Sequence, residues 1–310
     1  MTSIAIVIPT LNRAPLLQRS IASALACAPA PDEVVVVDCG SADNTSDVVR
    51  SFGSDVELIR RSLPNAASAR NMGLAYTRSR YVGFLDSDDE ALPGKTGGLA
   101  EVLDVASNAV LIHGTMDIIS GDGGLLPRVA AQNAQDRARA RGIGTSYAAL
   151  ASFCSMYTSA TLIRRSSFED VGGYDESLDA YEDLDLYLRL SLAGELKYAD
   201  IPACRYRVWG GNVAWDRTAE GIVEVARKHL RMLPSIPVEM RHDAQVGFRT
   251  RLAGSLYTLA ALPDARREAL AAVRLSPRRA LLIPEVRRAL TRSFLPRSIL
   301  TRVRSARSAR

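Results

Sequence analysis

The first 90 residues alternate continuous apolar runs with segments whose apolar positions recur at helical spacing. The apolar runs predict four short strands, at Ile4–Ile8, Val34–Val37, Val56–Ile59 and Tyr81–Leu85. Helices are expected between them, at Pro15–Leu25, Thr45–Phe52 and Ala66–Thr77. Continuous apolar strands that alternate with helices are typical of a mainly parallel sheet buried on both faces. The pattern therefore predicts an α/β fold with a Rossmann-like sheet flanked by helices.

The rest of the chain gives weaker patterns. We expect a helix and then a strand over 99–119, a strand at Ala160–Ile163, and a leucine-striped helix at Tyr181–Leu192 that Gly194 ends. A polar stretch, Gln132–Arg141, is expected to be loop. Beyond about Ala219 the sequence is rich in Arg, Ala and Leu and broken by prolines. We therefore predict an α/β domain over 1–218, with halves at about 1–98 and 99–218, and a helical C-terminal appendage over 219–310.

Composition describes an ordinary globular chain. Its 310 residues are 47% hydrophobic, which is enough to bury a sizeable core. The four cysteines are far apart and form no C-x-x-C, so neither a zinc site nor a disulfide framework is indicated. The N-terminus lacks a basic leader region, and no run of about 20 apolar residues occurs. A cytoplasmic protein, neither secreted nor membrane-spanning, is expected.

The net charge of +5 is concentrated near the C-terminus. No acidic residue follows Glu285, whereas eight arginines do: Arg287, Arg288, Arg292, Arg297, Arg302, Arg304, Arg307 and Arg310. This basic region has three interpretations: a solvated helical tail, an amphipathic surface that contacts anionic lipid, or a nucleic-acid contact. Aromatic residues do not interleave with the arginines, so no nucleic-acid partner is expected.

The chemistry-bearing residues follow the predicted strands. Asp86 and Asp88 lie directly after the fourth strand, and Asp38 ends the second. In parallel sheets such positions converge on one crevice at the carboxyl ends of the strands. Paired carboxylates are hard oxygen ligands for Mg²⁺ or Mn²⁺ on substrate phosphates, although acidic loops also cap helices and solvate surfaces. Asp38 is expected to bind a nucleobase or ribose; the alternative for the acidic and serine residues at this turn is to cap the helix at Thr45–Phe52.

Charged residues farther along the chain have two interpretations each. Arg70 lies among small residues of the third helix, where it would bind a diphosphate or pair with a crevice carboxylate. Glu182 and Asp183 begin the leucine-striped helix, where acidic side chains complement the helix dipole. The local excess of negative charge there favours a second role, in which a carboxylate removes a proton from an acceptor hydroxyl.

Taken in order, these segments resemble the inverting glycosyltransferases of family 2, which have the GT-A fold. Each segment is short and common by itself, and the six in sequence, within about residues 4–215, are specific. The matching segments are Val7–Arg13, Val37–Thr45, Ala69–Gly73, Phe84–Asp89, Gly172–Glu176 and Glu182–Asp185.

The resemblance implies a role for each matched position. Residues 1–98 would be the nucleotide-sugar half and 99–218 the acceptor half. Asp86 and Asp88 would hold Mg²⁺ or Mn²⁺ on the diphosphate, and Asp183 would be the general base of a single inverting displacement. The nucleotide-sugar side would comprise Pro9, Leu11, Arg13, Asp38, Arg70 and Asp86. The acceptor side would comprise Glu182, Gly173, Asp175 and Trp209.

Two departures from the family pattern matter. Cys39 stands where many members carry a second acid, which leaves the base of the nucleotide open, with a UDP- or dTDP-sugar favoured. Trp209 stands where a histidine is often found, so a third protein ligand for the metal is not indicated, and the ring is expected to pack in the core or to stack on a sugar.

The expected function is transfer of a sugar to a glycan or lipid-linked acceptor in cell-surface polysaccharide assembly, with membrane contact through the basic tail. One alternative is a sugar-phosphate nucleotidyltransferase, which would need a glycine-rich loop that Pro9–Arg13 lacks. Another is a non-catalytic sugar-nucleotide binder or scaffold.

Overall fold

The computed structural model describes residues 2–126, 144–208 and 215–292. These residues form two compact units, one of 1–146 with 154–212 and the other of 147–153 with 213–310. The short segment 147–153, which the sequence had placed in the α/β domain, groups with the C-terminal helices. Trp209 and the expected loop 132–141 lie outside the described residues.

The first unit is built on an eight-stranded, mostly parallel sheet in the order β3-β2-β1-β4-β7-β6-β8-β5. Its strands are β1 Ile4–Thr10, β2 Glu33–Asp38, β3 Glu57–Arg60, β4 Tyr81–Phe84, β5 Glu90–Ala91, β6 Ala109–Ser120, β7 Thr161–Arg164 and β8 Glu195–Val208. Strands β1 to β4 run parallel, and β7 joins β4 and β6 in antiparallel pairing. The strand order reverses beside β1, and open α/β sheets bind ligands at such a point, outside the carboxyl ends of the strands. We call the region at the carboxyl ends of β1, β2 and β4 the crevice.

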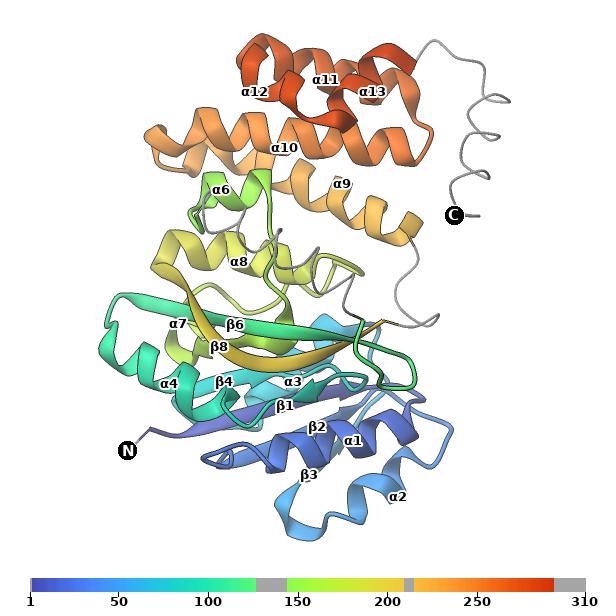
Figure 1. Ribbon diagram of the computed structural model, residues 1–310, viewed down its shortest axis with the longest axis vertical. Helices are drawn as coiled ribbons and strands as arrows, with labels where there is room; N and C mark the ends of the chain where they lie inside the picture. Colours follow the sequence, from blue (N-terminus) through green and yellow to red (C-terminus); the bar gives the residue numbers. More distant parts are fainter. Residues whose placement is uncertain (1, 127–143, 209–214, 293–310) are drawn as a thin grey trace. The chain divides into compact units, whose positions relative to one another are not determined.

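Helices cover both faces of this sheet (Figure 1). They are α1 Ala14–Leu25, α2 Thr45–Arg50, α3 Ala66–Ala75, α4 Lys95–Val105, α7 Arg165–Asp170 and α8 Glu182–Ala193, with short 3₁₀ turns η1 Gly53–Asp55 and η2 Thr158–Ala160. One face of β1, including Ile6, shares a core cluster with Leu17 of α1. On the other face α3 approaches closely, because a Cβ on Gly73 would lie 2.3 Å from Val7 Cγ1 and 3.0 Å from Val37 Cγ2. This close packing brings the side chains of α3 to the crevice.

The predicted strands and helices of the first 90 residues are all present, with ends shifted by up to two residues. Strand β8 was not predicted from the sequence. It contains Pro202 and several charged residues, and its pairing with β6 has irregular register around Thr115, so it lacks a regular apolar alternation. The mostly parallel sheet, the flanking helices and the C-terminal helices agree with the predicted fold class.

The second unit is helical. It comprises α6 Tyr147–Ser152, α9 Trp215–Met232, η3 Leu233–Ser235, α10 Val238–Thr258, α11 Leu262–Leu275, α12 Pro277–Leu282 and α13 Pro284–Arg292. Helix α10 packs against α6, α9, α11 and α13 (Figure 1). His229 is fully buried between Tyr147, whose hydroxyl lies 2.9 Å from Nδ1, and the ring of Phe248. None of the helices in the described ranges is both long and apolar enough to span a membrane.

Candidate active site

Two arginines hold the carboxylates that follow β4. Arg70 Nη2 lies 2.7 Å from Asp86 Oδ1, and Arg13 Nη1 lies 2.9 Å from Asp88 Oδ2. Asp86 is one third exposed, whereas the side chain of Asp88 is 8% exposed. Of the predicted pair, Asp86 therefore reaches the surface whereas Asp88 is almost enclosed, and an arginine lies against each.

Arg70 connects this turn to the start of α8. Its Nη1 lies 2.6 Å from Glu182 Oε1, so one guanidinium bridges two carboxylates, and its side chain is only 5% exposed. The guanidinium also lies 5.2 Å from the centre of the Tyr174 ring. Burial by itself would lower the pKa of Arg70, but the charges of Asp86 and Glu182 outweigh it and raise that pKa well above its usual value. The structure therefore shows Arg70 paired with a crevice carboxylate, and its contact with a diphosphate stays a prediction.

Asp183 lies beside this bridge, at the first turn of α8. Its Oδ1 accepts a hydrogen bond of 2.7 Å from the Leu184 N–H, and Tyr181, two residues before Asp183, has a φ of 60°. Burial, and then the negative charge of Glu182, raises the pKa of Asp183 to about 7. A carboxyl with that pKa accepts a proton near neutral pH, as a general base requires.

The loops after β1 and β2 are joined to each other. The Asn12 N–H donates to Ser41 Oγ (2.8 Å), the Ala42 N–H donates to Asn12 Oδ1 (2.8 Å), and the Ala14 N–H donates to Asp43 Oδ2 (3.0 Å). Asn12 adopts a φ of 53°, which an asparagine tolerates better than most residues. These contacts fix the loop that carries Arg13.

The other residues predicted for the nucleoside side differ in exposure. Leu11 is half exposed, whereas Pro9 is buried within β1. Asp38 is fully buried: its Oδ1 accepts from the Gly40 and Ser41 N–H groups at 3.2 and 2.8 Å. Arg60 Nε lies 3.3 Å from Asp38 Oδ2, which accepts no hydrogen bond among the described residues. Asp38 therefore stabilises its turn through Oδ1, and its Oδ2 can still accept a hydrogen bond.

Gly173 and Asp175, two of the residues predicted for the acceptor side, belong to a loop that packs against α3. Asn71 exchanges hydrogen bonds of 2.9 Å with the Tyr174 backbone in both directions. A Cβ on Gly173 would lie 2.8 Å from Asn71 Oδ1, and Gly173 has a φ of 70°, so a side chain there would be strained. Asp175 accepts from the N–H and hydroxyl of Ser177. Gly173 and Asp175 thus stabilise the conformation of the loop. Asn71 binds the loop to α3, although the sequence pattern assigned no role to this residue.

Sequence reasoning missed a buried network behind Asp86 and Asp88. Asp89 Oδ2 accepts from the Ser159 hydroxyl (2.6 Å), whose oxygen accepts from the Asp86 N–H (3.1 Å). Lys95 Nζ, fully buried, donates to the carbonyls of Phe84 (2.9 Å) and Ser159 (2.7 Å). Burial, reinforced by the charges of Asp86 and Asp88, raises the pKa of Asp89 well above its usual value. The only sequence signal was that Asp89 adjoins the predicted turn.

The carboxylates of Asp86 and Asp88 suit a divalent cation that a phosphate also helps to bind. Asp86 and Asp88 offer two carboxylates on a short turn, and Mg²⁺ commonly takes one or two protein carboxylates together with substrate phosphates. Within the described ranges, no group of three or more His, Cys, Asp or Glu side chains forms a ready-made metal cage. Two carboxylates on one turn match the protein ligands that such a cation commonly takes.

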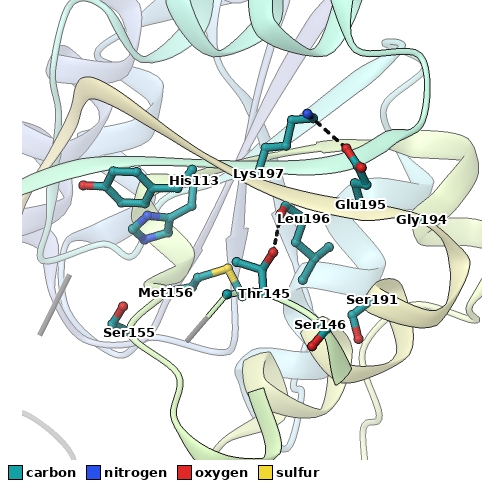
Figure 2. A pocket seen from close by; sticks show the side chains of 12 residues that line it. His113, Thr145, Ser146, Ser155, Met156, Ser191, Gly194, Glu195, Leu196 and Lys197 are labelled. Carbon is teal, nitrogen blue, oxygen red and sulfur yellow. Dashed lines mark hydrogen bonds and ion pairs between the residues drawn. The ribbon is translucent and has the colours of Figure 1, made fainter. Parts of the chain in front are cut away.

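A separate cavity of about 610 Å³ lies at the opposite end of α8 (Figure 2). His113, Ser191 and Tyr198 are among its lining residues, and an ion pair of 3.0 Å joins Lys197 and Glu195. No predicted site residue in the described part of the chain lines it. Since α8 has 12 residues, its two ends are roughly 18 Å apart.

Comparison with known proteins shows which sequences this chain is similar to. The sequence model of a family described as glycosyl transferase family 2 matches residues 5–172. The succinoglycan biosynthesis protein ExoU of Rhizobium meliloti is 32% identical over 225 residues, which cover 66% of this chain and 61% of that protein.

Two solved structures share the fold. The S. aureus TarS 1-349 complex with UDP-GlcNAc has a TM-score of 0.63 and 15% identity, and covers 93% of this chain and 87% of TarS 1-349. The mannosyltransferase PcManGT from Pyrobaculum calidifontis, in complex with GDP-Man and Mn²⁺, has a TM-score of 0.59 and 19% identity, with coverage of 94% and 87%.

The raised pKa of Asp183 has a consequence for stability. The fold disfavours the ionised form of Asp183, whose pKa is near 4 in the unfolded chain and about 7 in the folded protein. The folded protein therefore becomes less stable as the pH rises from about 4 to about 7. Asp183→Asn removes this penalty. The melting temperature of the variant minus that of the parent should therefore increase between pH 5 and pH 8 and then level off. A melting-temperature difference that is constant or that decreases over this pH range would contradict the raised pKa of Asp183.

Proposed function

The chain belongs to glycosyl transferase family 2, and from its crevice we propose that it moves a sugar from a nucleoside-diphosphate sugar to an acceptor hydroxyl with inversion. One observation carries this proposal: Arg70 joins Asp86, on the turn expected to hold the diphosphate, to Glu182, next to the expected base. Donor and acceptor chemistry would then take place in one crevice. A nucleotidyltransferase would also need a basic triphosphate loop, and no described contact favours one.

The donor side of the proposed site consists of Asp86 and Asp88 with Arg13 and Arg70. The two carboxylates would hold Mg²⁺ or Mn²⁺, whose charge stabilises the diphosphate as a leaving group. Both guanidiniums lie within hydrogen-bond distance of these carboxylates, so they are placed to bind phosphate oxygens once the cation takes over the carboxylates. Leu11 and the second oxygen of Asp38 would face the nucleoside.

The acceptor side depends on Asp183. Its carboxylate takes the proton of the acceptor hydroxyl as that oxygen bonds to the anomeric carbon. The bond from this carbon to the diphosphate oxygen breaks in the same step, and the nucleoside diphosphate leaves from the opposite face. Glu182 raises the pKa of Asp183, and Arg70 limits the resulting repulsion by pairing with Glu182.

The substrate class is proposed from the relatives. This chain spans 61% of the succinoglycan biosynthesis protein that it resembles, which supports a role in polysaccharide assembly with a glycan or lipid-linked acceptor. The fold neighbours bind UDP-GlcNAc and GDP-Man, so the fold accepts more than one base. We favour a UDP- or dTDP-sugar as the donor and Mn²⁺ or Mg²⁺ as the cation.

A surface of the second unit suits an anionic membrane. On α12, Leu281 and Leu282 are 44% and 76% exposed, and Arg278 is also exposed. Apolar side chains flanked by arginines bind interfaces that carry negative lipid charge. We propose a cytoplasmic enzyme that makes peripheral contact at the inner face of the membrane through this surface and the basic tail.

Replacing Asp183 by Asn tests the proposed base. The amide keeps the hydrogen bond from the Leu184 N–H but cannot take a proton, so transfer should fall by at least 1,000-fold while the donor dissociation constant stays within about three-fold. Product formation is measured by release of nucleoside diphosphate and donor binding by calorimetry. The control is Asp179→Asn, an exposed neighbour. Transfer at the parent rate in Asp183→Asn would exclude Asp183 as the base.

Replacing Asp88 by Ala tests the proposed cation site. Donor binding in the presence of Mn²⁺ should weaken by more than ten-fold, because one of two protein ligands is lost. Thermal shift with UDP and UDP-sugars, with and without Mn²⁺, measures the effect, since a ligand that binds only the folded state raises its melting temperature. The exposed Asp55→Ala serves as the control. Full binding in the presence of a chelator would contradict the metal role.

Co-sedimentation with vesicles tests the proposed membrane surface. The full chain should bind vesicles that contain anionic lipid and should be released as salt rises. Replacing Leu281 and Leu282 by Ser should reduce bound protein at least three-fold. The matched control replaces Val105 and Leu125 by Ser; these residues belong to the other unit and are 88% and 64% exposed. Equal binding of both double variants would place the contact elsewhere.

A further inference from the structure

The guanidinium of Arg207 lies behind the turn that carries Asp86 and Asp88. Arg207 belongs to β8, and its side chain is 1% exposed. Such a side chain remains buried only when its charge and its N–H groups are matched by the protein around it.

Arg207 contacts three consecutive residues of the turn and the strand after it. Its Nε donates to the Asp88 carbonyl (2.8 Å), and its Nη2 lies 2.6 Å from Glu90 Oε1. Its backbone N–H donates to Asp89 Oδ1 (2.9 Å). One residue of β8 thereby fixes a carbonyl, a carboxylate and a counter-charge on the segment that includes Asp88.

The same guanidinium also attaches this turn to the end of β6. Its Nη1 donates to the carbonyls of Ser120 (3.2 Å) and Gly121 (3.1 Å). A guanidinium reaches these groups together because its N–H donors lie in one rigid plane, whereas the ammonium of a lysine is a single point of charge. The arrangement therefore depends on the shape of the arginine as well as on its charge.

Arg205 provides an internal comparison. It lies two residues earlier on β8, so its side chain projects from the same face of the strand. Its Nη1 lies 3.5 Å from the other carboxylate oxygen of Glu90, but the side chain is about half exposed. No contact with Asp88 or Asp89 is recorded for Arg205 within the described part of the chain. The two arginines share one partner and differ in whether they contact the turn.

We propose that Arg207 is a positioning residue that fixes the Asp86–Glu90 backbone, so that Asp88 is held ready for a cation and a diphosphate. The part of this inference that concerns ligand binding rests on the proposed function. Arg207 does not touch the reacting atoms. It acts through the Asp88 carbonyl and the Asp89 carboxylate, and Ser159 holds the other oxygen of Asp89.

The test compares Arg207→Lys with Arg205→Lys in the full chain. Hydrogen exchange of the peptide that spans Asp86–Glu90, measured without metal or nucleotide, should be at least ten-fold faster in Arg207→Lys and within two-fold of the parent in Arg205→Lys. The dissociation constant for UDP in the presence of Mn²⁺ should rise at least ten-fold in Arg207→Lys only. If Arg207→Lys does not fold, Glu90→Gln, which removes the facing charge, should shift both quantities in the same direction by about three-fold.

The outcomes separate this inference from the proposed function. Equal exchange in the two lysine variants would overturn the positioning role. Faster exchange with unchanged affinity for Mn²⁺ and UDP would also overturn it, because Arg207 would then only support the fold. If the parent binds neither UDP nor other nucleotides with Mn²⁺ while exchange responds as expected, the fixed turn stands and the proposed function fails.

Discussion

The crevice depends on one buried arginine, Arg70, that lies between two carboxylates. Arg70 reaches Asp86 and Glu182 at 2.7 and 2.6 Å with a side chain that is almost fully enclosed. Removing one partner of a buried ion pair commonly costs about 3–5 kcal/mol, because a charge is left without compensation. The turn after β4 and the first turn of α8 are therefore held at a fixed separation. Without this bridge, Asp86, Asp88, Glu182 and Asp183 would repel one another across the crevice.

The same charge pattern explains how one site would perform two tasks. On the donor side, Arg13 and Arg70 neutralise carboxylates that a cation can take over. On the acceptor side, burial and the charge of Glu182 hold the pKa of Asp183 near 7. The carboxyl groups of Asp86 and Asp183 would thus take different roles because their surroundings differ. Asn71, Ser159 and Lys95 contribute by fixing the backbone around them.

The sequence predicted those features that depend on local pattern. Apolar runs located β1 to β4, and placement at their ends singled out Asp86 and Asp88. The sequence did not predict β8, because Pro202 and charged residues interrupt the alternation of apolar and polar positions there. It therefore assigned no role to Arg207. The partners of Arg70 lie 16 and 112 positions away, and nothing in a sequence pattern selects one carboxylate over another at such separations. The burial of Asp38 likewise depends on how its turn folds around it.

Anomalous diffraction from crystals grown with Mn²⁺ and UDP would show whether the turn after β4 holds the cation and the diphosphate. We expect one manganese peak within coordination distance of Asp86 or Asp88, with the diphosphate beside it and Arg13 moved from Asp88 to a phosphate oxygen. Nucleotide bound elsewhere, for example in the cavity beside Lys197 and Tyr198, or a peak that does not touch these carboxylates, would contradict this expectation.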